Sequence, residues 1–305
     1  MKKWISLMVA LFLAGLFSMN VRAKEGQTVV ALGADLTAAQ RETVLGLLGM
    51  TEEQLAGCQV VYITNGQEHQ YLGAYLDASL IGSKSLSSVM LRKGAAGSGV
   101  NVTTRNINYC TTGMYRNALL TAGVQDTEVV VAAPSQMSGT AALIGAVKAY
   151  EKLEGQEISD ESLSNALDEL ITTGELTEAM KNVSNEEIES LIAYIKEKVA
   201  AGELETEADI RAAIAEGEQR FGVTLDQEAV NQLVGLMNKL ERMGLDSSYL
   251  ISQAEKLYNK YGSEMVNYAD EAISEAVSEA AARAKEGLWE SMKSAFRGFL
   301  NKLFG

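Results

Sequence analysis

Residues 129–151, VVVAAPSQMSGTAALIGAVKAYE, constrain the fold more than any other stretch of the chain. Their apolar, β-branched beginning predicts a buried strand, and the chain's only proline, Pro134, marks a tight loop after that strand. A helix follows, and small residues open it at Ser138, Gly139 and Thr140. Strand patterns occur only up to this unit, and helical patterns alone follow it, so the unit ends one domain and leads into the next.

Short strands and helices alternate in residues 24–150. Apolar and β-branched runs predict strands at 27–33, 58–64, 85–92, 100–107 and 127–133, and helical spacing predicts helices at 35–50, 65–77 and 111–122. The strands on either side of the glycine-rich run GAAGSG are expected to pair as a hairpin. This order of elements predicts a mixed α/β sheet domain with helices packed on the sheet.

Residues 151–286 are expected to form an acidic, all-α helical domain. Apolar stripes at helical spacing recur at 160–172, 185–201, 207–221 and 227–243, and the pairs Ser184 with Glu187 and Thr206 with Asp209 are typical of helix starts. The stripes indicate a bundle core, and the acidic residues between them indicate a solvated face. The predicted fold class is therefore α+β, a mixed-sheet domain followed by a helical domain and an amphipathic C-terminal helix.

The last segment, residues 287–305, differs from the acidic helices before it. Its sequence GLWESMKSAFRGFLNKLF places large apolar side chains on one wide helical face and is locally cationic, which is typical of a helix that lies in a membrane interface. The side chains expected to meet a membrane or a partner are Trp289, Met292, Lys293, Phe296, Arg297, Phe299, Leu300 and Leu303. Docking on the helical bundle and self-association are the alternatives, and the sequence alone leaves them open.

The first 23 residues have the features of a secretory signal peptide. Lys2 and Lys3 precede an apolar run at 4–17, and VRA at 21–23 provides a cleavage site after Ala23. The alternative is an uncleaved membrane anchor, for which the apolar run is short. Cleavage would remove three basic residues and no acid, which lowers the net charge from −14 to −17. Such a charge disfavours nucleic acid and suits cationic partners or solubility.

Cys58 and Cys110 are the chain's only cysteines, and both fall in the first domain. Export would place them in an oxidising environment, where an even number of cysteines favours a disulfide. We therefore expect a Cys58–Cys110 bridge, with two buried free thiols as the alternative.

Long motifs run through the first domain. They are LGADL at 32–36, TN…E…YLG at 64–73, IGS…SS at 81–88, GSG.NV.T.NI at 97–107, MY.NAL.TAGV at 114–124 and AAP…SGTAAL.G..KAYE at 132–151. In these motifs the chain resembles the YpuA-like family of secreted Gram-positive proteins, which carry domain of unknown function 1002. The resemblance covers the first domain closely and the helical remainder loosely. It implies an extracytoplasmic location and a two-part architecture, and it supplies no catalytic residues.

The residue inventory favours a binding protein over an enzyme. The single histidine, His69, has no second histidine at the spacing of a zinc site, and the chain contains neither a GxSxG nor an SxxK motif. The run GAAGSG lacks the lysine of a phosphate-binding loop and lies between strands. We therefore expect no catalytic residue, no metal site and no cofactor.

The best candidate for a ligand site is the strand-to-helix segment at residues 134–140. The N–H groups at the start of a helix can receive an anion, and nearby hydroxyl and amide groups can add hydrogen bonds. The candidate ligand-binding residues are Pro134, Ser138, Gly139, Thr140, Asn101 and Asn106. In the alternative interpretation, Ser138 caps the helix and the small residues let it pack close to the sheet.

Together these features predict an extracytoplasmic binding or interaction protein of unknown ligand, peripheral on the outer face of the membrane through its C-terminal helix. The expected partners are an anionic membrane surface or a cell-envelope component, and not nucleic acid. The alternatives are a cell-envelope enzyme with a site near residues 134–140 and a structural protein that assembles through its helical domain.

Overall fold

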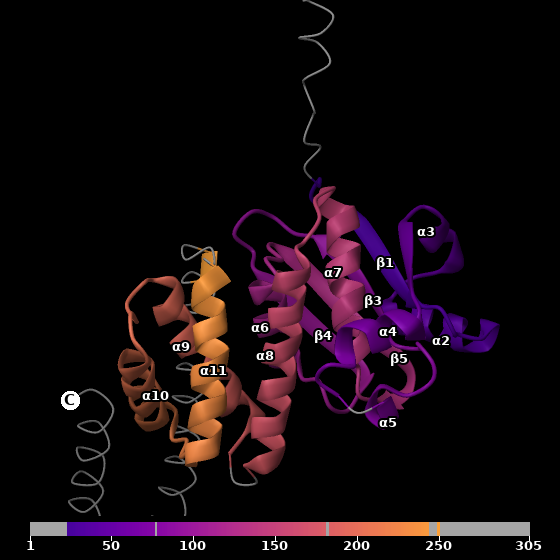
Figure 1. Ribbon diagram of the computed structural model, residues 1–305. Coiled ribbons are helices and arrows are strands. Elements are labelled where there is room, and N and C mark those ends of the chain that lie inside the picture. Colours follow the sequence, from indigo (N-terminus) through magenta and orange to yellow (C-terminus); the bar gives the residue numbers. More distant parts are fainter. Residues whose placement is uncertain (1–22, 77, 181–182, 244–248, 251–305) are drawn as a thin grey trace, which may run out of the picture. The chain divides into compact units, whose positions relative to one another are not determined.

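The computed structural model describes residues 23–76, 78–180, 183–243 and 249–250 (Figure 1). The chain divides into two compact units, Met1–Ile171 and Thr172–Gly305. The first unit holds a mixed sheet with helices, and every regular element described in the second unit is a helix, so the predicted α+β class is confirmed. The border falls inside helix α8 (Asp160–Ala179), whereas the expected border after residue 150 lies within helix α7 (Thr140–Glu154).

Five strands form one sheet in the order β2-β1-β3-β5-β4. Their bounds are β1 Thr28–Gly33, β2 Gln59–Ile63, β3 Ser88–Lys93, β4 Val100–Ile107 and β5 Thr127–Met137. The pairs β1–β2 and β4–β5 are parallel, and β3 is antiparallel to both of its neighbours. Four strands therefore finish at one end of the sheet, which we call the carboxyl end. β3 finishes at the opposite end, which we call the amino end.

The expected hairpin between β3 and β4 is wrong, because β5 lies between these two strands. β5 pairs with β3 from Ser88 to Lys93 on one side and with β4 on the other. Its apolar centre is buried, as suits an interior strand, whereas β4 alternates between covered and exposed residues, as suits an edge strand. Burial thus outweighs the local tendency of the glycine-rich run to join its flanking strands in a hairpin.

Helices cover both faces of the sheet. Alternate residues of β1 face opposite sides, so Val30 and Leu32 join the apolar cluster beneath α2 (Ala38–Leu48), and Ala31 faces α7 (Figure 1). α7 packs closely, since a Cβ on Gly145 would lie 3.2 Å from Val89 Cγ1 and 3.3 Å from Ala31 Cβ. The shorter helices of this unit are α3 Glu52–Ala56, α4 Asn65–Leu72, α5 Ala78–Ile81 and α6 Thr112–Thr121.

The second unit confirms the expected apolar stripes. Its remaining helices are α9 Asn185–Ala200, α10 Glu207–Phe221 and α11 Gln227–Met243. Their buried side chains form one cluster, in which Gly217 of α10 lets α9 approach, since a Cβ there would lie 2.3 Å from Leu191 Cδ1. α9 and α10 begin with capping boxes that contain an acid. The side chains of Ser184 and Thr206 accept from the backbone of Glu187 and Asp209, whose carboxylates accept in turn from the backbone of Ser184 and Thr206.

The first unit builds its capping boxes differently. Thr37, Thr51 and Thr64 cap helices α2, α3 and α4, and a glutamine completes each ring. α4 begins at Asn65, where the sequence predicted a helix to begin, and its N-cap residue is Thr64. Gln67 completes this cap, so Glu68 takes no part in it and is buried.

The expected disulfide is wrong, because Cys58 and Cys110 are both free thiols. Cys58 precedes β2 at the amino end, and Cys110 follows β4 at the carboxyl end, on opposite edges of the sheet. Three strands separate the two edge strands, which at about 4.8 Å per neighbour places these strands about 19 Å apart. A disulfide needs Cα atoms within about 7 Å. The Cys58 thiol instead donates to Gln54 O at 3.4 Å.

We expect a thiol reagent to label Cys58 in the native protein and Cys110 only after unfolding. Cys58 is half-buried, whereas Cys110 is 2% exposed and its burial raises the pKa of its thiol, which keeps it in the unreactive protonated form. Alkylation followed by peptide mass spectrometry, with and without denaturant, measures both sites. Protein that resists labelling until a reductant is added would contradict the free-thiol structure.

Candidate functional site

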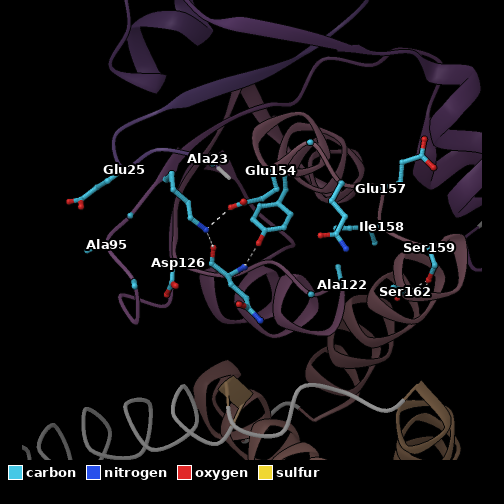
Figure 2. Close-up of a pocket in the computed structure, with 18 residues that line it drawn as sticks. Ala23, Glu25, Ala95, Ala122, Asp126, Glu154, Glu157, Ile158, Ser159 and Ser162 are labelled. Atoms are coloured by element: carbon cyan, nitrogen blue, oxygen red, sulfur yellow. Dashed lines mark hydrogen bonds and ion pairs between the residues drawn. The ribbon is translucent and has the colours of Figure 1, made fainter. Parts of the chain in front are cut away.

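A cavity of about 860 Å³ opens at the amino end of the sheet, within the first unit (Figure 2). It forms where β1 and β5 begin, where β3 ends and where α7 finishes after running back along the sheet. The lining residues are Ala23, Glu25, Lys93, Gly94, Ala95, Ala96, Ala122, Gly123, Gln125, Asp126, Tyr150, Glu154, Gly155, Gln156, Glu157, Ile158, Ser159 and Ser162. These residues come from segments far apart in the sequence, so no sequence motif predicted the cavity.

Lys93, at the end of β3, connects the walls of the cavity. Its Nζ lies 2.6 Å from Glu154 Oε1 and donates to Gln125 O at 3.1 Å (Figure 2). The same ammonium lies 5.8 Å from the centroid of the Tyr150 ring, and the Tyr150 hydroxyl accepts from Gln125 N at 3.2 Å. The Lys93 and Glu154 side chains are only 17% and 14% exposed. This network therefore ties the last turns of α7 to β3 and to the loop before β5.

The cavity is acidic. Its lining contains four carboxylates, those of Glu25, Asp126, Glu154 and Glu157, and one basic side chain, Lys93. Glu25 and Glu157 are exposed, whereas Asp126 is half-buried and accepts a hydrogen bond from Gly99 N at 3.0 Å. Since Lys93 balances Glu154, the lining side chains carry a net negative charge. Such a cavity attracts cations and repels anions.

The residues expected to bind a ligand lie at both ends of the sheet. Asn106 and the segment 134–140 meet at the carboxyl end, where Asn106 donates to Ala133 O at 2.9 Å. Asn101 lies near the amino end of β4, is exposed and donates to Ser98 O at 3.2 Å. The structure therefore separates Asn101 from the other candidates.

The start of α7 is covered by side chains. Gly139, and not Ser138, is the N-cap residue, with a φ of 86° and no side-chain capping bond, so the capping role considered for Ser138 is wrong. The Tyr115 hydroxyl donates to Gly139 O. A Cβ on Gly139 would lie 2.5 Å from that hydroxyl and 2.7 Å from Ile107 Cγ2, and Thr140 is 4% exposed. This packing supports a structural role, and ligand binding by Pro134, Ser138, Gly139 and Thr140 stays a prediction.

Two buried polar side chains that the sequence did not reveal, Glu68 and Ser85, lie at the carboxyl end of the sheet. Glu68 of α4 is 2% exposed, and its Oε1 has no hydrogen-bond partner among the described residues. Ser85, in the loop before β3, is fully buried and its hydroxyl also lacks a partner in that part of the chain. Burial raises the pKa of Glu68, and the charge of Asp35 adds to this, while Ser85 and Asn65 oppose it.

We expect the Glu68 carboxyl to make the protein less stable as the pH rises. Its pKa is above 4.5 in the folded state, so folding takes up a proton, and its contribution to the free energy of unfolding falls as the pH rises through that pKa. Glu68→Gln should flatten this dependence and stabilise the protein near neutral pH by about 1–3 kcal/mol, the cost of an unpaired buried polar group.

Thermal unfolding in EDTA at a series of pH values measures this effect. Glu42→Gln is the matched control, since Glu42 is an exposed acid on α2 of the same unit. Equal pH profiles for Glu68→Gln and the unmodified protein would contradict the expectation.

Two comparisons place the chain among known proteins. The model of the family described as "Protein of unknown function (DUF1002)" matches residues 32–257. The chain is also 39% identical over 239 residues to the "Uncharacterized protein YpuA" of Bacillus subtilis (strain 168), a match that covers 78% of this chain and 80% of that protein. No solved structure matches. The resemblance carried by the sequence motifs is thereby confirmed, and the chain belongs to the DUF1002 family of proteins of unknown function.

Proposed function

We propose that this protein is an extracytoplasmic binding protein without enzymatic activity, and that it takes a small cationic ligand into the acidic cavity. The observation that carries this proposal is the cavity itself, of about 860 Å³, with four carboxylates and one lysine in its lining. Its volume is within the usual range of about 300–1,000 Å³ for small-molecule sites. The net charge of the whole chain, −14, is negative like that of the cavity lining.

The lining suits an amine better than an anion. The ammonium of Lys93 is held by Glu154 and Gln125 O, so an anionic ligand would have to compete with Glu154 for it. A ligand ammonium would instead meet Glu25, Glu157 and Asp126 around the cavity. Two of these acids are exposed, so each contributes modestly and its effect is screened by salt.

The extracytoplasmic location rests on the signal peptide expected at residues 1–23. Ala23, at the expected cleavage site, is itself a lining residue of the cavity, so cleavage there would remove part of one wall and widen access. Among the described residues, no helix is both long and apolar enough to cross a membrane. The covered start of α7 gives no support to the alternative of an enzyme site near residues 134–140.

Membrane attachment is part of the same proposal. The C-terminal segment 287–305, with the candidate contact residues Trp289, Phe296 and Arg297, lies outside the described residues. Its sequence supports peripheral binding because each large apolar side chain buried in the interface contributes about 1.5–3 kcal/mol. An acidic body would be repelled by an anionic bilayer, so the tail would have to supply the attraction.

We expect amines to bind in the cavity. Spermidine should give saturable heat in calorimetry with the mature protein, whereas citrate should give none, and the affinity should fall as salt is added. The double variant Glu25→Gln with Glu157→Gln should weaken spermidine binding about two- to fivefold per charge removed. The matched control is Glu42→Gln together with Glu53→Gln, two exposed acids remote from the lining. Equal affinity in the cavity variant and the control, or no binding at all, would refute the proposal.

We expect the full-length mature protein to sediment with anionic vesicles at low salt, because the tail has an apolar face and three basic residues. A version that ends at Glu286, and the double variant Trp289→Ala with Phe296→Ala, should stay in the supernatant. Size measurement of the same samples without lipid separates self-association through the tail from membrane binding. Full-length protein that stays in the supernatant would remove the membrane part of the proposal.

A further inference from the structure

The ammonium of Lys93 lies among three groups that can bind a cation, on the wall of the acidic cavity. Glu154 Oε1 is 2.6 Å from Lys93 Nζ, and Gln125 O accepts from it at 3.1 Å. The centroid of the Tyr150 ring is 5.8 Å from the same atom. A carboxylate, a carbonyl oxygen and an aromatic ring are groups that hold ammonium ions in proteins. All four residues line the cavity, so a ligand in the cavity can reach this place (Figure 2).

The groups around the ammonium are held in place independently of the Lys93 side chain. Gln125 N donates to the Tyr150 hydroxyl at 3.2 Å, which fixes the loop before β5 against the last turns of α7. Tyr150 and Glu154 are four residues apart on α7, so their side chains lie on the same face of that helix. Loss of the Lys93 side chain would therefore leave the other three groups where they are.

Glu154 depends on a cation at this place. Its Oε1 is buried and, among the described residues, has no partner except the Lys93 ammonium. Glu154 is also the last residue of α7, where the partial negative charge of the helix end disfavours a carboxylate and favours a cation. Removal of the ammonium would leave a buried carboxylate oxygen without a partner, which is strongly destabilising.

The Lys93 side chain can leave this place while its backbone stays. Lys93 N donates to Gln27 O at 2.9 Å, and Lys93 O accepts from Gly26 N at 2.8 Å, so the end of β3 is fixed. The side chain is 17% exposed, and its flexible four-carbon stem can carry the ammonium into the solvent by rotation about single bonds. The ammonium is therefore a cation tethered to the cavity wall.

We propose that Glu154, Gln125 O and the Tyr150 ring form a subsite for a primary ammonium group, and that Lys93 occupies it as a tethered competitor of the ligand. This inference rests on the proposed amine-binding function and names the group that the cavity recognises. A primary ammonium has the same three donors as the lysine ammonium and can take its place. A quaternary ammonium has no N–H donor, so it cannot replace the bonds to Glu154 and Gln125.

Chemical rescue tests the subsite. Lys93→Ala removes a fragment of the side chain that has the structure of n-propylamine. We expect this variant to melt below the unmodified protein, and millimolar n-propylamine to raise its Tm saturably and by more than it raises that of the unmodified protein, whose subsite is occupied. Sodium chloride, n-propanol and tetramethylammonium chloride at the same concentration should not replace n-propylamine, because each lacks either the charge or the N–H donors.

Lys152→Ala is the matched control, because Lys152 is an exposed lysine in the last turn of α7 and does not line the cavity. Its Tm should respond to n-propylamine as that of the unmodified protein does. Adding Glu154→Gln to Lys93→Ala should abolish the rescue, since the amine then meets no carboxylate in the subsite. Lys93→Met keeps a stem of similar length and serves if Lys93→Ala does not fold, with ammonium chloride as the rescuing salt and sodium chloride as its control.

Spermidine calorimetry tests the competition. Lys93→Met should bind spermidine about tenfold more tightly than the unmodified protein, because no tethered ammonium has to be displaced first, and Lys152→Ala should bind it unchanged.

The subsite is overturned if n-propylamine stabilises Lys93→Ala no more than Lys152→Ala, if tetramethylammonium is equally effective, or if the rescue survives Glu154→Gln. Spermidine binding that is no tighter in Lys93→Met than in the unmodified protein would overturn the competition. Rescue of Lys93→Ala by n-propylamine, with no spermidine binding to any of these proteins, would refute the proposed function and leave the subsite. Spermidine binding to the unmodified protein without rescue of the variant would refute the subsite and leave the proposed function.

Discussion

The arrangement of the first unit depends on strand β5 lying inside the sheet, between an antiparallel neighbour and a parallel one. β5 carries the most continuous apolar run of the five strands, and its centre is buried. An interior place pairs both of its edges and covers both of its faces, which no edge place would do. β3 is thereby reversed relative to the other four strands, and β4 is displaced to the edge.

This reversal gives the two ends of the sheet different chemistry. At the amino end, β3 delivers Lys93 among the beginnings of the other strands, where it meets Glu154 of the returning helix α7. At the carboxyl end, the loop before β3 delivers Ser85 to the ends of β1 and β2. Lys93 and Ser85 thus lie at opposite ends of the sheet. Lys93 lines the acidic cavity, and Ser85 lies beside buried Glu68.

Local patterns in the sequence predicted the strands, most helices and the α+β class, because alternation and helical spacing depend on neighbours along the chain. Strand order was not predictable in this way. The run GAAGSG has the composition of a hairpin turn, yet the burial of β5, far along the chain, decides which strands pair. Cys58 and Cys110 were expected to form a disulfide because they are the only cysteines of a chain expected to be exported. The strand order places them on opposite edges of the sheet.

The candidate sites were less predictable than the fold. Residues 134–140 lead from strand β5 into helix α7, but the tight loop expected at Pro134 is wrong, because β5 continues to Met137. Tyr115 and Ile107 cover the start of α7, and only tertiary packing shows this. Thr64 with Gln67 and Asn65 with Glu68 are both plausible caps in the sequence, and only the structure shows that Thr64 is the cap and that Glu68 is buried. The cavity carries no sequence signature, since its walls come from segment ends.

The two kinds of capping box make the helix starts of the two units respond differently to acid. Threonine–glutamine rings contain nothing that titrates, so the helix starts of the sheet unit keep their caps at any pH. The helical unit relies on carboxylates, and the bond from Thr206 holds the pKa of Asp209 below its usual value, so acid removes that cap. Glu68 acts in the other direction, since its raised pKa means that folding takes up a proton there. Acid would therefore weaken the start of α10, while the caps of α2, α3 and α4 stay intact.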